Sequence, residues 1–268
     1  TQDPIDGVSM LHTFNDAAAP EHHETQYFEV MGNRAIYHKG WTAVTKHYTP
    51  WINTPRVPLD EDVWELYDTN NDWSQSKDLS KEMPDKLREL QRLFIIEATR
   101  YKVLPLDDRL FEKMNPDTAG RPVLIKGKTQ VLAGGMGHLG ENCMLSIKNK
   151  SHTVTAEIVV PEGGAEGVII AQGADIGGWS LYALNGKLKY CYNWGGFKHF
   201  MVEGATKMSP GEHQVRMEFA YAGGGLGKGG KATLYVDGNK DGEGDIEATL
   251  ANVFSADDGC DVGRDGGS

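Results

Sequence analysis

Residues 63–101 read VWELYDTNNDWSQSKDLSKEMPDKLRELQRLFIIEATRY, and this stretch decides the fold of the first part of the chain. Its start, residues 63–67, is aromatic and β-prone, which predicts a strand. Polar residues that favour turns follow at 70–74. Apolar residues then recur at steps of three and four, which predicts one amphipathic helix over residues 79–101; they are Leu87, Leu90, Phe94, Ala98 and Tyr101.

The start of this helix carries its own signals. Asp78 or Ser80 is expected to cap it, and Pro84 is tolerated because it falls in the first turn. The apolar stripe must lie against another element, and the residues upstream offer one. Residues 26–30, 35–38 and 41–46 predict three further strands, with Gly32-Asn33 in a tight turn between the first two. We therefore expect a first domain at residues 1–104, a small antiparallel sheet with one long helix.

The composition changes after this domain. Residues 105–122 carry three prolines with charged residues and predict an extended linker. From residue 123 to 268 glycine is abundant and short β-prone runs recur, which is typical of an antiparallel sandwich. The runs are 123–125, 143–148, 153–159, 168–172, 179–184, 187–194, 200–202, 213–220 and 232–236, with Asn185-Gly186 and Asp237-Gly238 as hairpin turns. The predicted fold class is α+β, dominated by β-structure.

Composition and charge exclude several classes of protein. The chain has 268 residues, of which 39% are hydrophobic, and no apolar run is long enough to span a membrane. We therefore expect a soluble protein without a membrane partner. A net charge of −11 disfavours binding to nucleic acid. The three cysteines, Cys143, Cys191 and Cys260, are scattered, so they form neither a disulfide framework nor a zinc site.

The first part of the chain resembles the C-terminal subdomain of bacterial arylsulfatases, members of the sulfatase (alkaline phosphatase-like) family. The resemblance rests on WELYD at 64–68 with the leucine-rich helix after it, PIDGVS at 4–9, TQYFE at 25–29, GNRAIY at 32–37 and Gly40-Trp41. It covers Pro4 to Arg109 and extends towards the C-terminus. It implies a sulfuric ester hydrolase whose nucleophile is a formylglycine, acting beside a calcium or magnesium ion. It also implies a bacterial protein, located in the cytoplasm or the periplasm.

That chemistry is not encoded in this chain. The family forms its formylglycine from Cys or Ser in a C/S-x-P/A-x-R motif. None of the three cysteines precedes such residues, and no serine does. The resemblance places the motif and most cation ligands upstream, in a catalytic domain that would be the partner of this chain. We therefore expect no catalytic residue and no cofactor here, and a chain that represents a fragment.

The second part resembles a laminin-G/concanavalin-A-like jelly roll. The residues that carry this resemblance are GWSLY at 178–182, NGKL at 185–188, HQVRM at 213–217 and ATLYVDG at 232–238. Such a fold closes with a strand near its C-terminus that pairs beside the first. None is expected after residues 261–265, which supports the expectation of a fragment.

Three groups of residues are candidates for a binding site. His12, His22 and His23 form one and are expected at the rim of a substrate pocket or as ordinary polar loop residues. Aromatic side chains on two neighbouring strands could stack on sugars or fill the core; they are Trp179, Tyr182, Tyr190, Tyr192 and Trp194. Acidic residues near the end could hold calcium or form a solvated edge; the candidates are Asp257, Asp258 and Asp261.

Three short motifs are set aside. Residues 225–231 satisfy G-x-x-x-x-G-K, but Ala232 replaces the Ser/Thr of a phosphate-binding loop and a strand is expected next. Residues 237–242 begin like a calcium loop, but its twelfth position is Ala248 rather than Glu. Asn149 begins a glycosylation triplet, a pattern that is common by chance.

The sequence therefore predicts the C-terminal part of an arylsulfatase-like enzyme, which by itself serves structure or substrate positioning. The alternatives are a carbohydrate-binding module, with sulfated or other glycans as partners, and a structural sandwich that mediates homo-oligomers.

Overall fold

The structure is a computed structural model, and it describes residues 5–50, 52, 56–267. Pro4, where the sulfatase resemblance begins, lies outside the described residues. The chain divides into two compact units, Thr1–Leu110 and Phe111–Ser268. Each unit has a hydrophobic core of its own. The boundary falls inside the expected linker of residues 105–122.

The second half of that linker is folded rather than extended. It holds a 3₁₀ turn, η2 (Phe111–Met114), and a short helix, α2 (Pro116–Ala119). Asn115 caps α2 by accepting a hydrogen bond from the Asp117 N–H, and its own side-chain amide donates to the carbonyl of Ala251. Its side chain is fully buried. The prolines at this point start a helix instead of extending the chain, because proline suits the first helical position.

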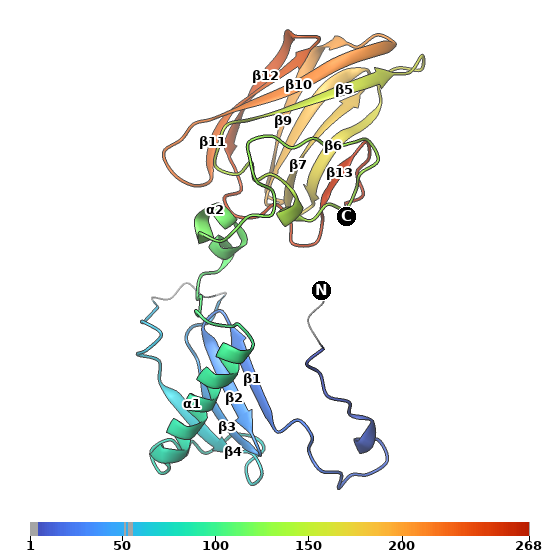
Figure 1. Ribbon diagram of the computed structural model, residues 1–268. Coiled ribbons are helices and arrows are strands. Elements are labelled where there is room, and N and C mark those ends of the chain that lie inside the picture. Colours follow the sequence, from blue (N-terminus) through green and yellow to red (C-terminus); the bar gives the residue numbers. More distant parts are fainter. Residues whose placement is uncertain (1–4, 51, 53–55, 268) are drawn as a thin grey trace. The chain divides into compact units, whose positions relative to one another are not determined.

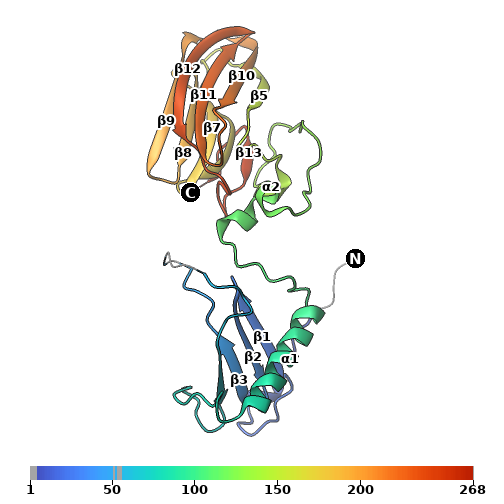
Figure 2. The ribbon, with the colours of Figure 1, turned by 90° about the vertical axis from the view of Figure 1, so that its left-hand side faces the viewer.

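The first unit is a four-stranded antiparallel sheet covered by a helix, as Figures 1 and 2 show. The strands are β1 (Thr25–Val30), β2 (Asn33–His38), β3 (Trp41–Thr45) and β4 (Trp64–Asp68), in that order across the sheet. Helix α1 (Pro84–Arg100) packs Leu90, Phe94 and Ala98 against Ile36 and Leu66. The four strands of the sheet lie where the β-prone runs of the sequence predicted them. The turn between β1 and β2 falls on Met31-Gly32, one residue before the expected pair.

The start of α1 differs from the prediction. The helix begins at Pro84, not at residue 79, and its cap residue Met83 makes no side-chain hydrogen bond. Asp78 instead accepts hydrogen bonds from the N–H groups of Leu66 and Ser80, so it joins the β4 strand to the following turn. Because the Asp78 carboxylate bonds these two N–H groups, it does not cap α1.

The second unit is an antiparallel sandwich of two sheets, shown in Figure 1. One sheet has the order β12-β11-β10-β5 and the other β13-β6-β7-β8-β9. The first sheet's strands are β5 (His152–Val160), β10 (Gly211–Tyr221), β11 (Lys228–Val236) and β12 (Asn239–Ala248). The second sheet's strands are β6 (Gly167–Ala174), β7 (Gly177–Leu184), β8 (Lys187–Trp194), β9 (Lys198–Lys207) and β13 (Cys260–Val262). Side chains from both sheets form one core, including Leu181, Tyr190, Val215 and Leu234.

The two hairpin turns of the sandwich are confirmed. Asn185 and Gly186 have φ values of 55° and 78°, and Asp237 and Gly238 have 51° and 79°. Both central residues of a type I′ turn need positive φ, which Asn, Asp and Gly tolerate.

Two expected strands are absent from the described residues, and two others were missed. Residues 123–125 are irregular, and so are residues 144–148 after a short 3₁₀ turn, η3 (Glu141–Cys143). In the second segment the side chain of Gln130 bonds backbone groups that a neighbouring strand would otherwise bond. Its amide nitrogen donates to the Cys143 carbonyl, and its amide oxygen accepts from the Leu145 N–H. The missed strands are β12, whose charged sequence hides its pattern, and β13.

Strand β13 overturns one expectation directly. Cys260, Asp261 and Val262 pair antiparallel with Gln172, Ala171 and Ile170 of β6. The described sandwich therefore includes a short strand near its C-terminal end, where the sequence indicated none, and this strand pairs beside β6 rather than beside β5, the first strand of the sandwich. Three residues were too few to produce a visible alternation in the sequence.

Candidate functional site

The three N-terminal histidines are not gathered in one site. His12 and His22 stack with ring centroids 3.7 Å apart, and His12 Nε2 lies 3.0 Å from the carbonyl of Pro20. His23 is separate and is hydrogen-bonded to Gln26 Oε1 at 2.9 Å. Across residues 5–50, 52 and 56–267, no group of three or more His, Cys, Asp or Glu side chains is arranged to hold a metal ion.

His23 does border a small cavity of about 250 Å³ in the first unit. The cavity lies where the start of the chain meets β1 and the end of α1. Its polar lining includes Asp6, His23, Gln26 and Glu97, and two tyrosines, Tyr27 and Tyr101, complete it. The tyrosine rings stack with centroids 5.4 Å apart. Glu97 was not singled out from the sequence, because it sits at the edge of the apolar stripe of α1 and resembles a surface residue there.

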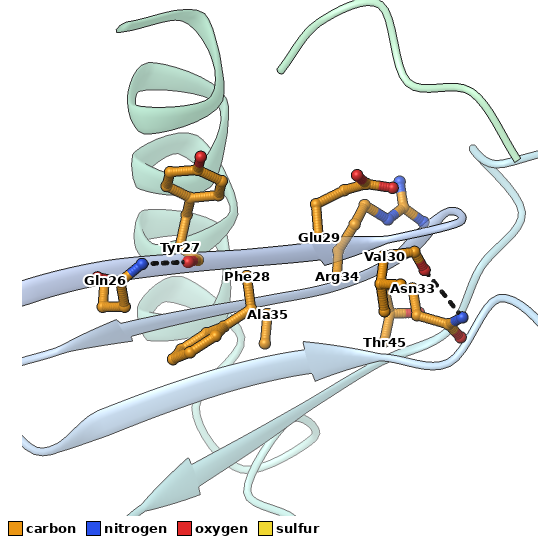
Figure 3. A pocket seen from close by; sticks show the side chains of 9 residues that line it. All are labelled: Gln26, Tyr27, Phe28, Glu29, Val30, Asn33, Arg34, Ala35 and Thr45. Carbon is orange, nitrogen blue, oxygen red and sulfur yellow. Dashed lines mark hydrogen bonds between the residues drawn. The ribbon is translucent and has the colours of Figure 1, made fainter. Parts of the chain in front are cut away.

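A larger hollow, about 550 Å³ in volume, surrounds the hairpin of β1 and β2. Figure 3 shows Phe28 and Ala35 on one side of the hairpin, and Tyr27 and Glu29 on the other. On the side of Phe28 the edge strand β1 is exposed: Phe28 is 54% exposed and Val30 is 58% exposed. This hollow is an open apolar face rather than an enclosed pocket with convergent polar groups.

A buried ionic network lies at the end of β3. His47 Nδ1 is 2.9 Å from Asp62 Oδ1, and His47 Nε2 is 3.2 Å from Asp108 Oδ2. Arg34 also pairs with Asp62, and Arg56 with Asp108. Burial is the main reason that the pKa of Arg34 is lowered. Each carboxylate in this network is paired with basic side chains. The network therefore connects β2, the end of β3 and the segment after α1, and we interpret it as structural. Its members are far apart in the chain, and no sequence signal joins them.

The aromatic residues of the sandwich divide into core and surface. Trp179, Tyr190 and Tyr192 are buried in the core between the sheets, so they cannot stack on a sugar. Burial raises the pKa of Tyr190 well above its ordinary value. Only Tyr182 and Trp194 of the predicted set remain accessible. Trp194 lies 6.1 Å from Phe197, a residue that is 86% exposed and that the sequence did not single out.

Ser209, His213 and Asp237 form a constellation that resembles a hydrolase triad. His213 Nδ1 lies 2.7 Å from Asp237 Oδ2, and Ser209 Oγ is 3.4 Å from His213 Nε2. However, His213 Nε2 also lies 2.8 Å from the carbonyl of Ser209, which can only accept. Nε2 therefore carries a proton and cannot remove one from the Ser209 hydroxyl. The cluster connects the start of β10 to the turn after β11 and does not activate a nucleophile.

Two of the three acidic candidates near the C-terminus accept hydrogen bonds from groups of the protein itself. Asp261 accepts hydrogen bonds from the N–H groups of His138 and Gly266, which lower its pKa. Asp258 accepts from the Ser255 hydroxyl at 3.2 Å. Asp257 is exposed, and these carboxylates do not form a cation site with other described side chains.

The three motifs that were set aside are structural. Lys228 begins strand β11, so no helix follows the glycine-rich loop. Asp237 lies in a hairpin turn between β11 and β12. The side chain of Asn149 is engaged at both ends, because its amide donates to the Ala251 carbonyl and its oxygen accepts from the Gly227 N–H.

Comparisons with known proteins bear on the fold alone. No protein-family model matches the chain, and no curated protein matches it. Solved structures with some similarity include domains LG4-5 of the mouse laminin α1 chain, 21% identical over 45% of this chain and 28% of that one, with a TM-score of 0.30. The LG1-3 region of the laminin α2 chain is 14% identical over 43% of this chain and 22% of that one, with a TM-score of 0.32.

A third similar structure is the native heptameric SAP-like pentraxin of Limulus polyphemus, 14% identical over 43% of this chain and 60% of that one, with a TM-score of 0.26. The chain thus spans less than two thirds of each of these proteins. No helix among the described residues is long and apolar enough to cross a membrane.

Proposed function

We propose that this chain is the C-terminal part of an arylsulfatase-like sulfuric ester hydrolase, and that its first unit docks on the catalytic domain of that enzyme. The residues that resemble the sulfatase family provide the assignment. In this proposal the catalytic domain supplies the formylglycine nucleophile and the calcium or magnesium ion. This chain supplies structure and helps to position the substrate.

The observation that carries the proposal is the apolar surface of the first unit. None of residues 5–24 is buried, although the segment contains Ile5, Met10, Leu11 and Phe14, each at least 68% exposed. Phe28 and Val30, on the edge strand β1, are further exposed apolar residues of this unit. Large apolar patches on a folded protein mark sites where another polypeptide binds. A unit built as the edge of a larger enzyme would have this surface.

Complex formation tests the proposal. The purified chain is mixed with a bacterial arylsulfatase catalytic domain from which the C-terminal subdomain has been removed, and the mixture is separated by size-exclusion chromatography. We expect one peak that contains both. The variant Phe28→Glu should abolish this peak, and Val159→Glu, at an exposed position of the sandwich, should not. Separate elution of the wild-type chain would count against the proposal.

A second candidate function is glycan binding by the sandwich. The neighbouring exposed rings of Trp194 and Phe197 favour it, because aromatic faces stack well on apolar sugar faces. Trp194→Ala should then abolish retention on immobilised sulfated glycans, while Trp73→Ala, an exposed tryptophan in the first unit, should leave it unchanged. Equal retention of the two variants would exclude this surface.

A further inference from the structure

The small cavity of the first unit contains a carboxylate that lacks a partner. Glu97 is only 9% exposed, and no hydrogen bond or ion pair joins its carboxylate to another residue described in the structure. Most of the Glu97 side chain is covered by protein, and its carboxylate meets the outside only through the cavity that it lines. Since this carboxylate borders an open cavity, its partner has space to enter from outside.

The other charged group of the cavity lining is also negative. Asp6 adds a second carboxylate, and neither lysine nor arginine is among the lining residues. The nearest described cation on the same helix, Arg100, has its guanidinium 5.3 Å from the ring centre of Tyr101 and makes no ion pair with Glu97. The cavity therefore presents negative charge that the surrounding residues do not neutralise.

Two aromatic rings complete the lining. Tyr27 and Tyr101 line the cavity with their rings stacked on each other, and the guanidinium of Arg100 already lies over the Tyr101 ring, which shows that a cation packs favourably against it. Carboxylates combined with tyrosine rings suit an organic cation better than a metal ion, which needs several oxygen or nitrogen ligands around one point. A volume of about 250 Å³ accommodates a group of a few heavy atoms.

We propose that this cavity binds an alkylammonium or guanidinium group, with Glu97 as its ion-pair partner and the two tyrosines as its walls. The proposal is independent of the sulfatase assignment. The cation can come from a free amine or from a lysine or arginine side chain of another polypeptide, and the chemistry of recognition is the same for both.

Binding of defined cations tests this inference in the full chain. Butylguanidinium is titrated and followed by NMR of the Tyr27 and Tyr101 rings, with neutral butylurea as its shape-matched control. We expect saturable shifts with butylguanidinium only. Glu97→Gln should weaken binding at least tenfold, and Glu89→Gln, on the exposed side of α1, should not change it. Equal affinity of the Glu97→Gln and wild-type chains, or equal shifts with butylurea, would overturn the proposal.

Two further readouts complete the test. Glu97→Gln removes a carboxylate that has no partner among the described residues, so this variant should melt no lower than the wild-type chain without ligand; a clear loss of stability would show that Glu97 already has a partner and would overturn the proposal. N-acetylarginine amide distinguishes the sources of the cation. If it binds as well as butylguanidinium, the cavity accepts a protein side chain; if only butylguanidinium binds, it accepts a free amine or guanidine.

Discussion

The imidazole of His47 lies 2.9 Å from the carboxylate of Asp62, and both side chains are almost completely buried. Arg34 approaches the same carboxylate, so Asp62 holds two basic groups in the interior of the first unit. A buried network of this kind makes a small fold sensitive to the loss of any one member, because the remaining charges lose their partner without regaining water.

Removal of Asp62 should therefore destabilise the first unit strongly. We expect Asp62→Ala to lower the free energy of unfolding by about 3–5 kcal/mol, the usual result of breaking a buried pair. Urea denaturation followed by Trp fluorescence measures this change. Asp60→Ala, an exposed position two residues earlier, should change it by less than about 0.5 kcal/mol. Similar values for the two variants would show that the network contributes little.

The pair of His213 and Asp237 should make the second unit sensitive to pH. The hydrogen bonds with Asp237 and with the Ser209 carbonyl raise the pKa of His213, and the pKa of Asp237 is lowered, chiefly by its bond with His213. The contribution of His213 is complete below about pH 6.5 and is lost as the pH rises through its higher folded-state pKa. That of Asp237 is complete above about pH 3.9 and is lost as the pH falls through its lower folded-state pKa.

NMR titration of the His213 ring measures this effect. Asp237→Asn should lower the pKa of His213 towards its ordinary value, and Asp257→Asn, an exposed carboxylate of the same unit, should leave it unchanged. If the pKa of His213 stays elevated in Asp237→Asn, the hydrogen bond is not its cause.

Asn149 should be a structural residue and should remain unglycosylated. It has a φ of 60° and makes two side-chain hydrogen bonds to backbone groups. Alanine loses both bonds and tolerates this φ poorly, so Asn149→Ala should cost about 2–4 kcal/mol. Asn239→Ala, at the exposed first residue of β12, serves as the control. A glycan found at Asn149 by mass spectrometry in a glycosylating host would contradict this assignment.

The three thiols should react at very different rates. Cys143 is exposed, Cys191 is half-buried, and Cys260 is buried with a pKa of about 12, raised chiefly by burial. Thiolates are the reactive form. At pH 8 iodoacetamide should label Cys143 first, and Cys260 only after denaturation. Peptide mass spectrometry measures the order, and early labelling of Cys260 in the folded chain would disprove it.

The strands that the sequence predicted correctly share a clear physical cause. β8 alternates polar and apolar residues, and β2, β7 and β8 are each followed by a turn that contains glycine, so local signals identify them. β12 does not alternate polar and apolar residues, because the polar residue Asp241 points towards the core. Its carboxylate accepts a hydrogen bond from the Thr206 N–H. Local patterns do not reveal a polar residue that is buried by a distant strand.

The candidate sites were harder to predict for the same reason. The three histidines were chosen because they are close in sequence, yet the structure separates His23 from the stacked pair. Aromatic alternation identified Trp179, Tyr190 and Tyr192 but did not tell which face of the sheet is buried. Glu97 and the His47 network depend on contacts between residues far apart in the chain, which a single sequence does not reveal.

The most direct test of the whole account is the rate of aryl sulfate hydrolysis. Sulfate release is measured for the purified chain alone, for the truncated arylsulfatase catalytic domain alone, and for the two together. The account predicts no turnover by the chain alone, because it lacks the nucleophile motif, and an increase of at least tenfold when the two are mixed. Turnover by the chain alone, or no gain on mixing, would contradict it.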